Sequence, residues 1–211
     1  MVLAGATRAI WQRGQFKLVL AGGNTPREIY RELSATGADW TAWHIYFGDE
    51  RCLPADDLAR NSRMAYEAWL GWVPIPPAQI HVIPAESGAI AAARAYADVL
   101  RTVGEFDMVL LGLGEDGHTA SLFPGHDWGT AAGSPDVLAV ADAPKPPPQR
   151  VSLSAVRLSR ARQVLFWVWG QSKRAAVDSW RAGVLIPAAA IAPAAGVDIL
   201  ADAALIASSG D

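Results

Sequence analysis

Residues 16–34 read FKLVLAGGNTPREIYRELS and join an apolar run to an amphipathic segment through two glycines. Phe16–Ala21 is the kind of apolar stretch that forms a buried strand of a parallel sheet. Arg27–Ser34 has helical periodicity, with Thr25 predicted as the N-cap and Pro26 at the first helical position. The stretch therefore predicts a strand, a glycine turn and a helix.

The same alternation of strand and helix patterns continues along the chain. Further strands are predicted at His44–Phe47, Gln79–Ile83, Phe106–Leu111, Val137–Ala141, Val151–Leu153 and Val164–Trp169. Helices are predicted at Ala4–Arg13, Asn61–Leu70, Ala89–Val103 and Lys173–Arg181. The segment Val184–Ala207 is predicted to be a core helix and a strand joined by a turn that contains proline. Such alternation predicts an α/β fold, a single domain over residues 1–211 whose open, mostly parallel sheet carries helices on both faces.

Composition narrows the class of protein. The 211 residues are 51% hydrophobic and carry a net charge of −3, which argues against a nucleic-acid partner but allows a small anionic ligand. The single cysteine, Cys52, cannot form an internal disulfide. Charges and prolines interrupt the apolar C-terminal segment, so no membrane span is expected. We expect a cytoplasmic protein, either a monomer or a weak homodimer.

Three polar, glycine-containing motifs follow directly after predicted strands. They are Gly22–Thr25, Gly48–Arg51 and Gly112–His118. Ligands of open α/β sheets bind at the carboxyl ends of the strands. We therefore expect all three motifs to lie at one edge of the sheet and to form the functional site together.

The first two motifs are suited to anion binding. Gly22 and Gly23 allow a ligand to approach the backbone, and the following helix directs its free N–H groups and positive dipole end toward a phosphate. Asn24 and Thr25 add side-chain donors. In the second motif, Arg51 can form a bidentate contact with an anion or stabilise negative charge in a transition state. A simple capped turn and a surface ion-pair cluster are the respective alternatives.

The third motif contains GxGxxG, the dinucleotide-binding pattern, in the run GLGEDGH. We reject that reading because Glu115 and Asp116 stand where a pyrophosphate needs amides. Pro124 and Gly125 also stop any helix after about two turns. A glycine loop that presents His118 to a cleft fits better, since a histidine can take and return a proton near neutral pH. A hydrogen-bonded structural histidine is the alternative.

Metal binding is not indicated, because the four histidines show no ligand spacing and Cys52 stands alone. We predict no metal and no cofactor. Arg150 precedes one predicted strand and Lys173 follows another. Both can reach the same sheet edge and neutralise a phosphate, although a solvated surface charge would explain either of them alone.

Taken together, the motifs resemble a known family along nearly the whole chain. They are AGGNTP (21–26), FGDERCLP (47–54), RNSRMA (60–65), GLGEDGHTASLFPG (112–125), RVSLS (150–154) and GQSK (170–173). This set is similar to the glucosamine-6-phosphate isomerase/6-phosphogluconolactonase family, and DGHTASLFPG is its most diagnostic part. The resemblance implies a three-layer sandwich with a Rossmann-like sheet, as in the glucosamine-6-phosphate deaminase fold. It also implies hydrolysis of a phosphorylated sugar lactone, 6-phospho-D-glucono-1,5-lactone, in the oxidative pentose phosphate pathway.

The same resemblance implies roles for individual residues. His118, Arg51 and Asp116 fall on catalytic positions, with His118 as the general base. Substrate-binding positions fall on Gly22, Gly23, Asn24, Thr25, Asp49, Gly117, Arg150 and Lys173. Whether Asp116 orients His118 stays open at this point. Two other functions remain. One is deaminase or isomerase chemistry, although enzymes of that kind typically have a Phe-Asn-Glu stretch after the histidine, where this chain has Ser-Leu-Phe-Pro. The other is a non-catalytic sugar-phosphate sensor.

Overall fold

A computed structural model of the chain describes residues 1–206, and its centre is a five-stranded parallel sheet. The strand order is β2-β1-β4-β7-β8. These strands are β1 (Phe16–Leu20), β2 (Trp43–Phe47), β4 (Met108–Gly112), β7 (Val164–Val168) and β8 (Val197–Ala201). The predicted α/β fold with a mostly parallel sheet is confirmed.

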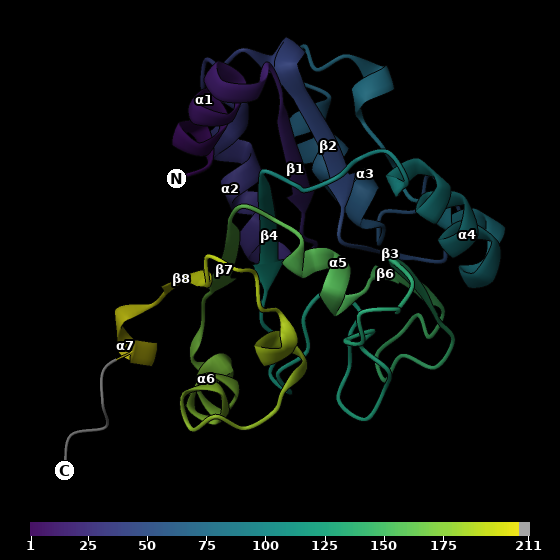
Figure 1. Ribbon diagram of the computed structural model, residues 1–211, viewed down its shortest axis with the longest axis vertical. Coiled ribbons are helices and arrows are strands. Elements are labelled where there is room, and N and C mark those ends of the chain that lie inside the picture. The colour runs from purple at the N-terminus through teal and green to yellow at the C-terminus, as the bar shows by residue number, and fades with distance from the viewer. Residues whose placement is uncertain (207–211) are drawn as a thin grey trace.

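Helices flank this sheet. They are α1 (Val2–Arg13), α2 (Asn24–Ser34), α3 (Asn61–Ala65), α4 (Ala89–Leu100), α5 (Ala155–Ser159), α6 (Arg174–Arg181) and α7 (Ala203–Ile206). In Figure 1, α1 and α2 lie on one side of the sheet and α4 lies on the other side, near β3 and β6. A π-helical turn at Tyr66–Leu70 extends α3, and a 3-10 turn at Gln171–Lys173 precedes α6. Within residues 1–206, no helix is long and apolar enough to cross a bilayer.

A second, antiparallel sheet contains a strand that the sequence did not predict. Its order is β3-β6-β5, with β3 at Asp49–Arg51, β6 at Arg150–Leu153 and β5 at Val137–Val140. Gly48 connects the two sheets, because its N–H donates to Leu20 O (3.0 Å) while its carbonyl accepts from Leu153 N (2.8 Å). Asp49–Arg51, expected to be part of a polar motif after β2, is therefore itself a strand that pairs with β6.

Two local predictions were wrong. Gln79–Ile83 is not a strand: a 3-10 turn occupies Pro77–Gln79, and only one isolated bridge, Ile45 to Ile80, reaches the sheet. Thr25 is not the N-cap of α2. Gly23 takes that place with φ 114°, a backbone conformation that favours glycine, so the helix begins before Thr25.

The C-terminal prediction was only partly right. The expected core helix is a 3-10 turn at Pro187–Ala190, where the proline stands at the start of the turn, and the expected strand is β8. The short helix α7 follows it. Ala207, the last residue of the predicted segment, lies outside the described residues.

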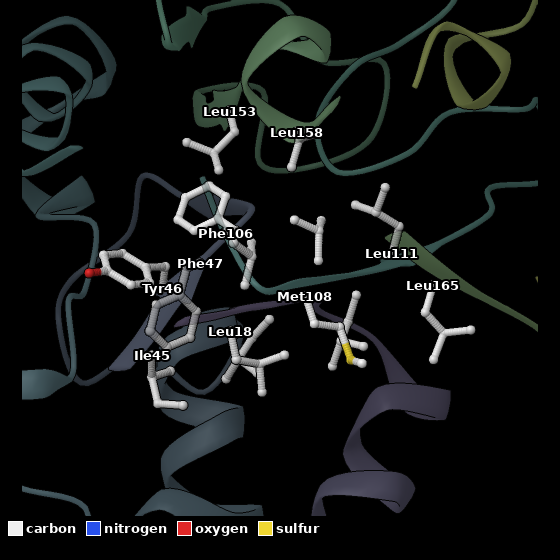
Figure 2. Close-up of a cluster of buried hydrophobic side chains, with 14 of the residues drawn as sticks. Leu18, Ile45, Tyr46, Phe47, Phe106, Met108, Leu111, Leu153, Leu158 and Leu165 are labelled. Atoms are coloured by element: carbon white, nitrogen blue, oxygen red, sulfur yellow. The ribbon is translucent and has the colours of Figure 1, made fainter. Parts of the chain in front are cut away.

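Both sheets contribute to one hydrophobic core. Leu18, Phe47 and Leu165 from the parallel sheet are at most 1% exposed. They pack in the same cluster as Leu153 of β6 and Leu158 of α5, which Figure 2 shows above them. Because this packing joins the two sheets, it fixes the ends of their strands relative to each other.

Candidate active site

The carboxyl ends of the parallel strands open into a cleft of about 230 Å³. The three predicted motifs meet there, as expected from the topology. The predicted site residues that line it are Gly22, Gly23, Asp49, Arg51, His118, Arg150 and Lys173. Asn24 and Thr25, in the first turn of α2, and Asp116 and Gly117, in the loop before His118, lie next to these lining residues in the chain.

The glycine turn forms one end of the cleft. Tyr30 on α2 holds this turn, because its hydroxyl accepts from Ala21 N (3.0 Å) and donates to Ala21 O (2.9 Å). The turn therefore leads directly from β1 into α2, whose first N–H groups face the end of the sheet. Asn24 is exposed and Thr25 half-buried. Gly23 is the N-cap of α2, and within residues 1–206 neither side chain forms a hydrogen bond, so both remain available to a ligand.

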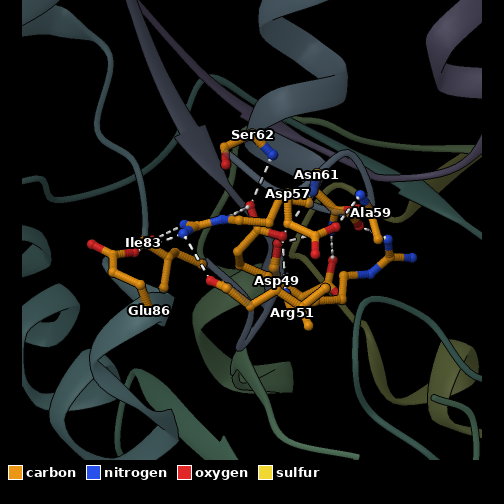
Figure 3. Close-up of polar contacts among 11 residues, drawn as sticks. Asp49, Arg51, Asp57, Ala59, Asn61, Ser62, Ile83 and Glu86 are labelled. Carbon is orange, nitrogen blue, oxygen red and sulfur yellow. Dashed lines mark hydrogen bonds and ion pairs between the residues drawn. The ribbon is translucent and has the colours of Figure 1, made fainter. Parts of the chain in front are cut away.

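Glu50 holds the second motif in place through hydrogen bonds made by its buried carboxylate. This carboxylate is fully buried and accepts from Arg51 N (2.9 Å), Asn61 N (2.7 Å) and Ser62 N (2.8 Å). It also forms an ion pair with Arg60, whose Nε lies 3.4 Å from Glu50 Oε2. Arg60 forms a second ion pair with Glu86, through its Nη1 at 2.6 Å from Glu86 Oε2. Figure 3 shows this network linking β3 to the start of α3. Glu50 thus satisfies the free amides of α3 and fixes Asn61 against the cleft.

Asn61 is the site residue that sequence reasoning missed. Its Nδ2 donates to Asp49 O (3.0 Å) and to Asp49 Oδ1 (2.9 Å), and the residue is 3% exposed. The other carboxylate oxygen of Asp49 accepts from Ser121 Oγ at 2.6 Å. Both oxygens of Asp49 are therefore held by protein side chains. A Cβ on Gly22 would lie 1.9 Å from Asn61 Oδ1. Residue 22 is therefore a glycine because the Asn61 side chain packs directly against its backbone.

Arg51 lies where the two sheets meet. It pairs in register with Arg150 across β3 and β6, so that two guanidinium groups line the same cleft. One nitrogen, Nη1, donates to Ala59 O. The Nε is buried and has no hydrogen-bond partner within residues 1–206. A buried donor of this kind is costly unless it meets an acceptor, which an anionic ligand would supply.

His118 and Asp116 form a hydrogen-bonded pair at the other end of the cleft. Nδ1 of His118 contacts Oδ1 of Asp116, so Nε2 is the ring nitrogen available to a ligand. Burial lowers the pKa of His118, and the hydrogen bond and charge of Asp116 oppose this shift. Burial also disfavours ionised Asp116, but its interactions with His118 outweigh that effect and lower the pKa of Asp116. The open question is answered by geometry: Asp116 faces His118.

Glycines in the loop make this pair possible. A Cβ on Gly114 would lie 1.9 Å from Nδ1 of His118, and Gly114 N donates to His118 O at 2.7 Å. Gly117 has φ 82°, and a Cβ there would meet Ile186 at 2.8 Å. Ala120, which lines the cleft, has φ 48°, a conformation that is uncommon for alanine. The loop is therefore a tightly fitted turn rather than the start of a helix.

Known proteins resemble this chain in sequence and in structure. The family model for glucosamine-6-phosphate isomerases/6-phosphogluconolactonase matches residues 1–200. A 6-phosphogluconolactonase of Synechocystis is 39% identical over 180 residues, which is 81% of this chain and 73% of that protein. One from Mycobacterium tuberculosis is 39% identical over 198 residues, covering 86% and 80%.

Several solved structures have similar folds. The 6-phosphogluconolactonase of Thermotoga maritima superposes with a TM-score of 0.88 at 25% identity, over 95% of this chain and 91% of that one. A monomeric glucosamine-6-phosphate deaminase, at 20% identity and a TM-score of 0.81, shares the fold. Fold and site thus define an α/β protein with a glycine turn before a helix and a histidine–carboxylate pair at one sheet edge. The chain belongs to the glucosamine-6-phosphate isomerase/6-phosphogluconolactonase family.

Proposed function

We propose that the protein hydrolyses 6-phospho-D-glucono-1,5-lactone to 6-phospho-D-gluconate, with His118 as the general base. The observation that carries the proposal is the placement of His118. Its Nδ1 is engaged by Asp116, and its ring lines the same cleft as Gly22, Gly23 and Lys173. The relatives named 6-phosphogluconolactonase support the substrate.

The reaction requires two proton transfers, and one histidine can perform both. Nε2 of His118 takes a proton from water as the water oxygen attacks C1 of the lactone. The carbonyl oxygen becomes negative and is stabilised by Arg51, whose Nε is buried without a partner in residues 1–206. The tetrahedral intermediate then collapses, the bond from C1 to the ring oxygen breaks, and His118 returns its proton to that oxygen. The carboxylic acid so formed ionises to the product carboxylate.

Burial favours the neutral form of His118, which is the form that acts as a base. Because its pKa is lowered, the ring is neutral at neutral pH and can accept a proton. Asp116 then stabilises the imidazolium that forms and fixes the tautomer, with the proton on Nδ1. The phosphate binds at the opposite end, on the glycine turn and the start of α2, with Lys173 as its cation.

The test is a lactone-decay assay corrected for spontaneous hydrolysis. We expect the wild-type protein to accelerate decay, and His118→Ala to lower kcat by about 10²–10⁴-fold, the usual contribution of general acid–base catalysis. His126→Ala is the matched control, since His126 contacts Pro124 O and Asp142 O and does not line the cleft. A His118→Ala protein with near-normal turnover would contradict the role of His118.

The same preparation separates the related deaminase function. Glucosamine 6-phosphate is incubated with the protein, and released ammonia is measured. We expect no ammonia release, because Ser121, three residues after His118, donates a hydrogen bond to Asp49 in this chain. Ammonia release without lactone hydrolysis would replace the proposal by the deaminase reaction.

A further inference from the structure

The loop that contains the catalytic pair, residues 114–118, is closed mainly on itself. Gly114 N donates to His118 O at 2.7 Å, and Gly117 N donates to Gly114 O at 3.0 Å. Within residues 1–206, one hydrogen bond joins this loop to a distant segment, in which Ala188 N donates to Gly117 O at 3.1 Å. Figure 1 shows that segment, between α6 and β8, beside the loop that follows β4. The catalytic loop therefore depends on a segment about 70 residues further along the chain for its polar attachment.

Ile186 packs against the same glycine. A Cβ on Gly117 would lie 2.8 Å from Ile186 Cβ, 3.0 Å from Cγ2 and 3.1 Å from Cδ1. Carbon atoms in contact are usually about 3.5–4.0 Å apart, so the Ile186 side chain fills the space beside the Gly117 Cα. Ile186 is 8% exposed and does not line the cleft. It therefore contacts the catalytic loop without reaching a ligand in the cleft.

The segment that carries Ile186 is itself fixed. Ile186 leads into the 3-10 turn Pro187–Ala190. Pro187 is buried and its ring restricts φ, which limits the conformations open to the turn. Beyond the turn, Ala192 N donates to Ser159 Oγ of α5 at 2.9 Å. The segment thus gives the catalytic loop a support with a defined position.

Gly117 is the residue between the two members of the catalytic pair, Asp116 and His118. A shift of its peptide moves the two side chains relative to each other and changes the hydrogen bond between Nδ1 and Oδ1. We propose that Ile186 is a positioning residue: with Ala188 it holds the Gly117 peptide, and so keeps the catalytic pair aligned. The inference rests on the proposed function only for the step that it affects, the proton transfer by His118. The dependence of the pair on Ile186 is independent of the substrate.

Variants at position 186 separate this contact from simple filling of space. Ile186→Val keeps Cβ and Cγ2, two of the three atoms nearest to Gly117, although it is smaller. Ile186→Leu keeps the volume but moves the branch away from Cβ, so Cγ2 is lost. Ile186→Ala loses both Cγ2 and Cδ1. Positioning predicts that Ile186→Val behaves most like the wild type, followed by Ile186→Leu and then Ile186→Ala, whereas filling of space alone predicts that Ile186→Leu does.

The first test reads the tautomer of His118 and needs no substrate. The ring nitrogen shifts of isotopically labelled histidines are measured by NMR above the pKa of His118, and His118→Ala assigns the signals. In the wild-type protein we expect the neutral ring to carry its proton on Nδ1, because Asp116 accepts it. Ile186→Ala should populate the form protonated on Nε2 to about a tenth or more, while Ile186→Val stays close to the wild type. An unchanged tautomer in Ile186→Ala would overturn the proposal.

The second test compares two buried isoleucines of the same segment. Ile191 is 3% exposed, belongs to the same core cluster as Ile186 and follows the other end of the 3-10 turn. Ile186→Ala should lower kcat for the lactone by about tenfold, part of the roughly 10²-fold that a 1 Å misplacement can cost, and change KM by less than about twofold. Ile191→Ala removes the same atoms, so it should lower the midpoint of urea denaturation similarly but keep kcat within about twofold of the wild-type value. Equal losses of kcat in the two variants would make Ile186 a purely structural residue and overturn the proposal.

The comparison does not depend on the stability of one variant. If Ile186→Ala does not fold, Ile186→Val and Ile186→Leu replace it, because such exchanges between apolar side chains are usually tolerated in a core. We then expect a lower kcat and a mixed His118 tautomer in Ile186→Leu but not in Ile186→Val. The reverse order would overturn the proposal.

These outcomes are distinguishable from failure of the proposed function. A wild-type protein that does not hydrolyse the lactone would contradict the lactonase proposal. The tautomer of His118 in Ile186→Ala would still show whether Ile186 aligns the pair.

Discussion

The two ends of the cleft are built differently. At the glycine-turn end, Gly22 and Gly23 offer backbone groups, while Asn24 is exposed and Lys173 is half-buried. The catalytic end is defined by Asp49, Asn61, Asp116, His118 and Ser121. Its side chains form two hydrogen-bonded groups, Asp49 with Asn61 and Ser121, and Asp116 with His118. Asp49, Asn61 and Ser121 are each at most 6% exposed.

The proposed function, with phosphate binding at the glycine-turn end and proton transfer at the catalytic end, accounts for this difference. A phosphate is bound by any well-directed set of amides and cations, so backbone geometry and a helix terminus suffice. Proton transfer requires reacting groups held within a fraction of an ångström, which demands side chains fixed by hydrogen bonds and packing. Changes at the catalytic end should therefore act on kcat, whereas changes at the glycine-turn end should act on KM.

Replacing Asp116 should produce the largest effect among changes outside His118 itself. Asp116→Asn keeps the shape but lets Nδ1 face an amide, so the imidazolium loses its carboxylate and the tautomer is no longer fixed. We expect kcat to fall by about 10²-fold or more, with KM nearly unchanged. Because a negative charge is removed, the pKa of His118 should fall further, and the acid limb of kcat/KM should move to lower pH. Pre-steady-state or steady-state rates across pH 5–8 provide the measurement.

Glu115→Gln is the matched control for that change, since Glu115 is the exposed neighbour in the same loop. It should leave kcat and the acid limb unchanged. If both variants moved the acid limb equally, the hydrogen bond from Asp116 to His118 would have no effect beyond that of a nearby charge. The catalytic end would then be no more ordered than the glycine-turn end.

Gly22 is where the two ends touch, and Gly22→Ala tests that contact. A Cβ there would lie 1.9 Å from Asn61 Oδ1, so Asn61 must move and release Asp49. We expect kcat/KM to fall by about tenfold and stability by about 1–3 kcal/mol, as for overpacking of a filled site. Gly37→Ala is the control, because nothing lies within 4 Å of a Cβ at that position. Kinetics and urea denaturation are measured on both, and equal behaviour would contradict the coupling of the two ends.

The glycine-turn end was predictable from sequence because its signals are local. A buried strand, two glycines and a helix follow one another within residues 16–34, and the topology places them at the cleft. The catalytic end was predictable only in part. His118 and Asp116 belong to one motif, but Asn61 acts through Glu50 and Asp49, which are 11 and 12 residues away in the chain. No local pattern reports that contact.

Strand β3 shows the same limit on prediction. Asp49, Glu50 and Arg51 have neither apolar alternation nor β-branched side chains, so nothing in them predicts a strand. They form one because β6 lies beside them and Glu50 is buried by the amides of α3.

Asn61→Ala and Asn24→Ala compare the same residue type at the two ends. Asn61 is buried and donates twice to Asp49, so its loss should lower stability by about 1–3 kcal/mol and kcat several-fold. Asn24 is exposed, so Asn24→Ala should leave stability within about 0.5 kcal/mol and raise only KM. Thermal unfolding and kinetics of both variants make the comparison. A larger loss of stability in Asn24→Ala would reverse the assignment of the two ends.

Among the changes at the catalytic end, Ser121→Ala should give the smallest effect, because it removes one of the two side chains that hold Asp49. The Oγ of Ser121 donates to Asp49 Oδ2 at 2.6 Å, while Asn61 keeps its bonds to Oδ1 and to the backbone. We expect a loss of about 0.5–1.5 kcal/mol, the usual net contribution of one hydrogen bond, since Asp49 keeps Asn61 as a partner, with kcat lowered less than in Asn61→Ala. Combined with Asn61→Ala, the loss should exceed the sum of the single changes, since Asp49 would then be a buried carboxylate without either side-chain partner. Strict additivity in urea denaturation would mean that Asn61 and Ser121 act independently, and that the catalytic end is a set of separate contacts rather than one network.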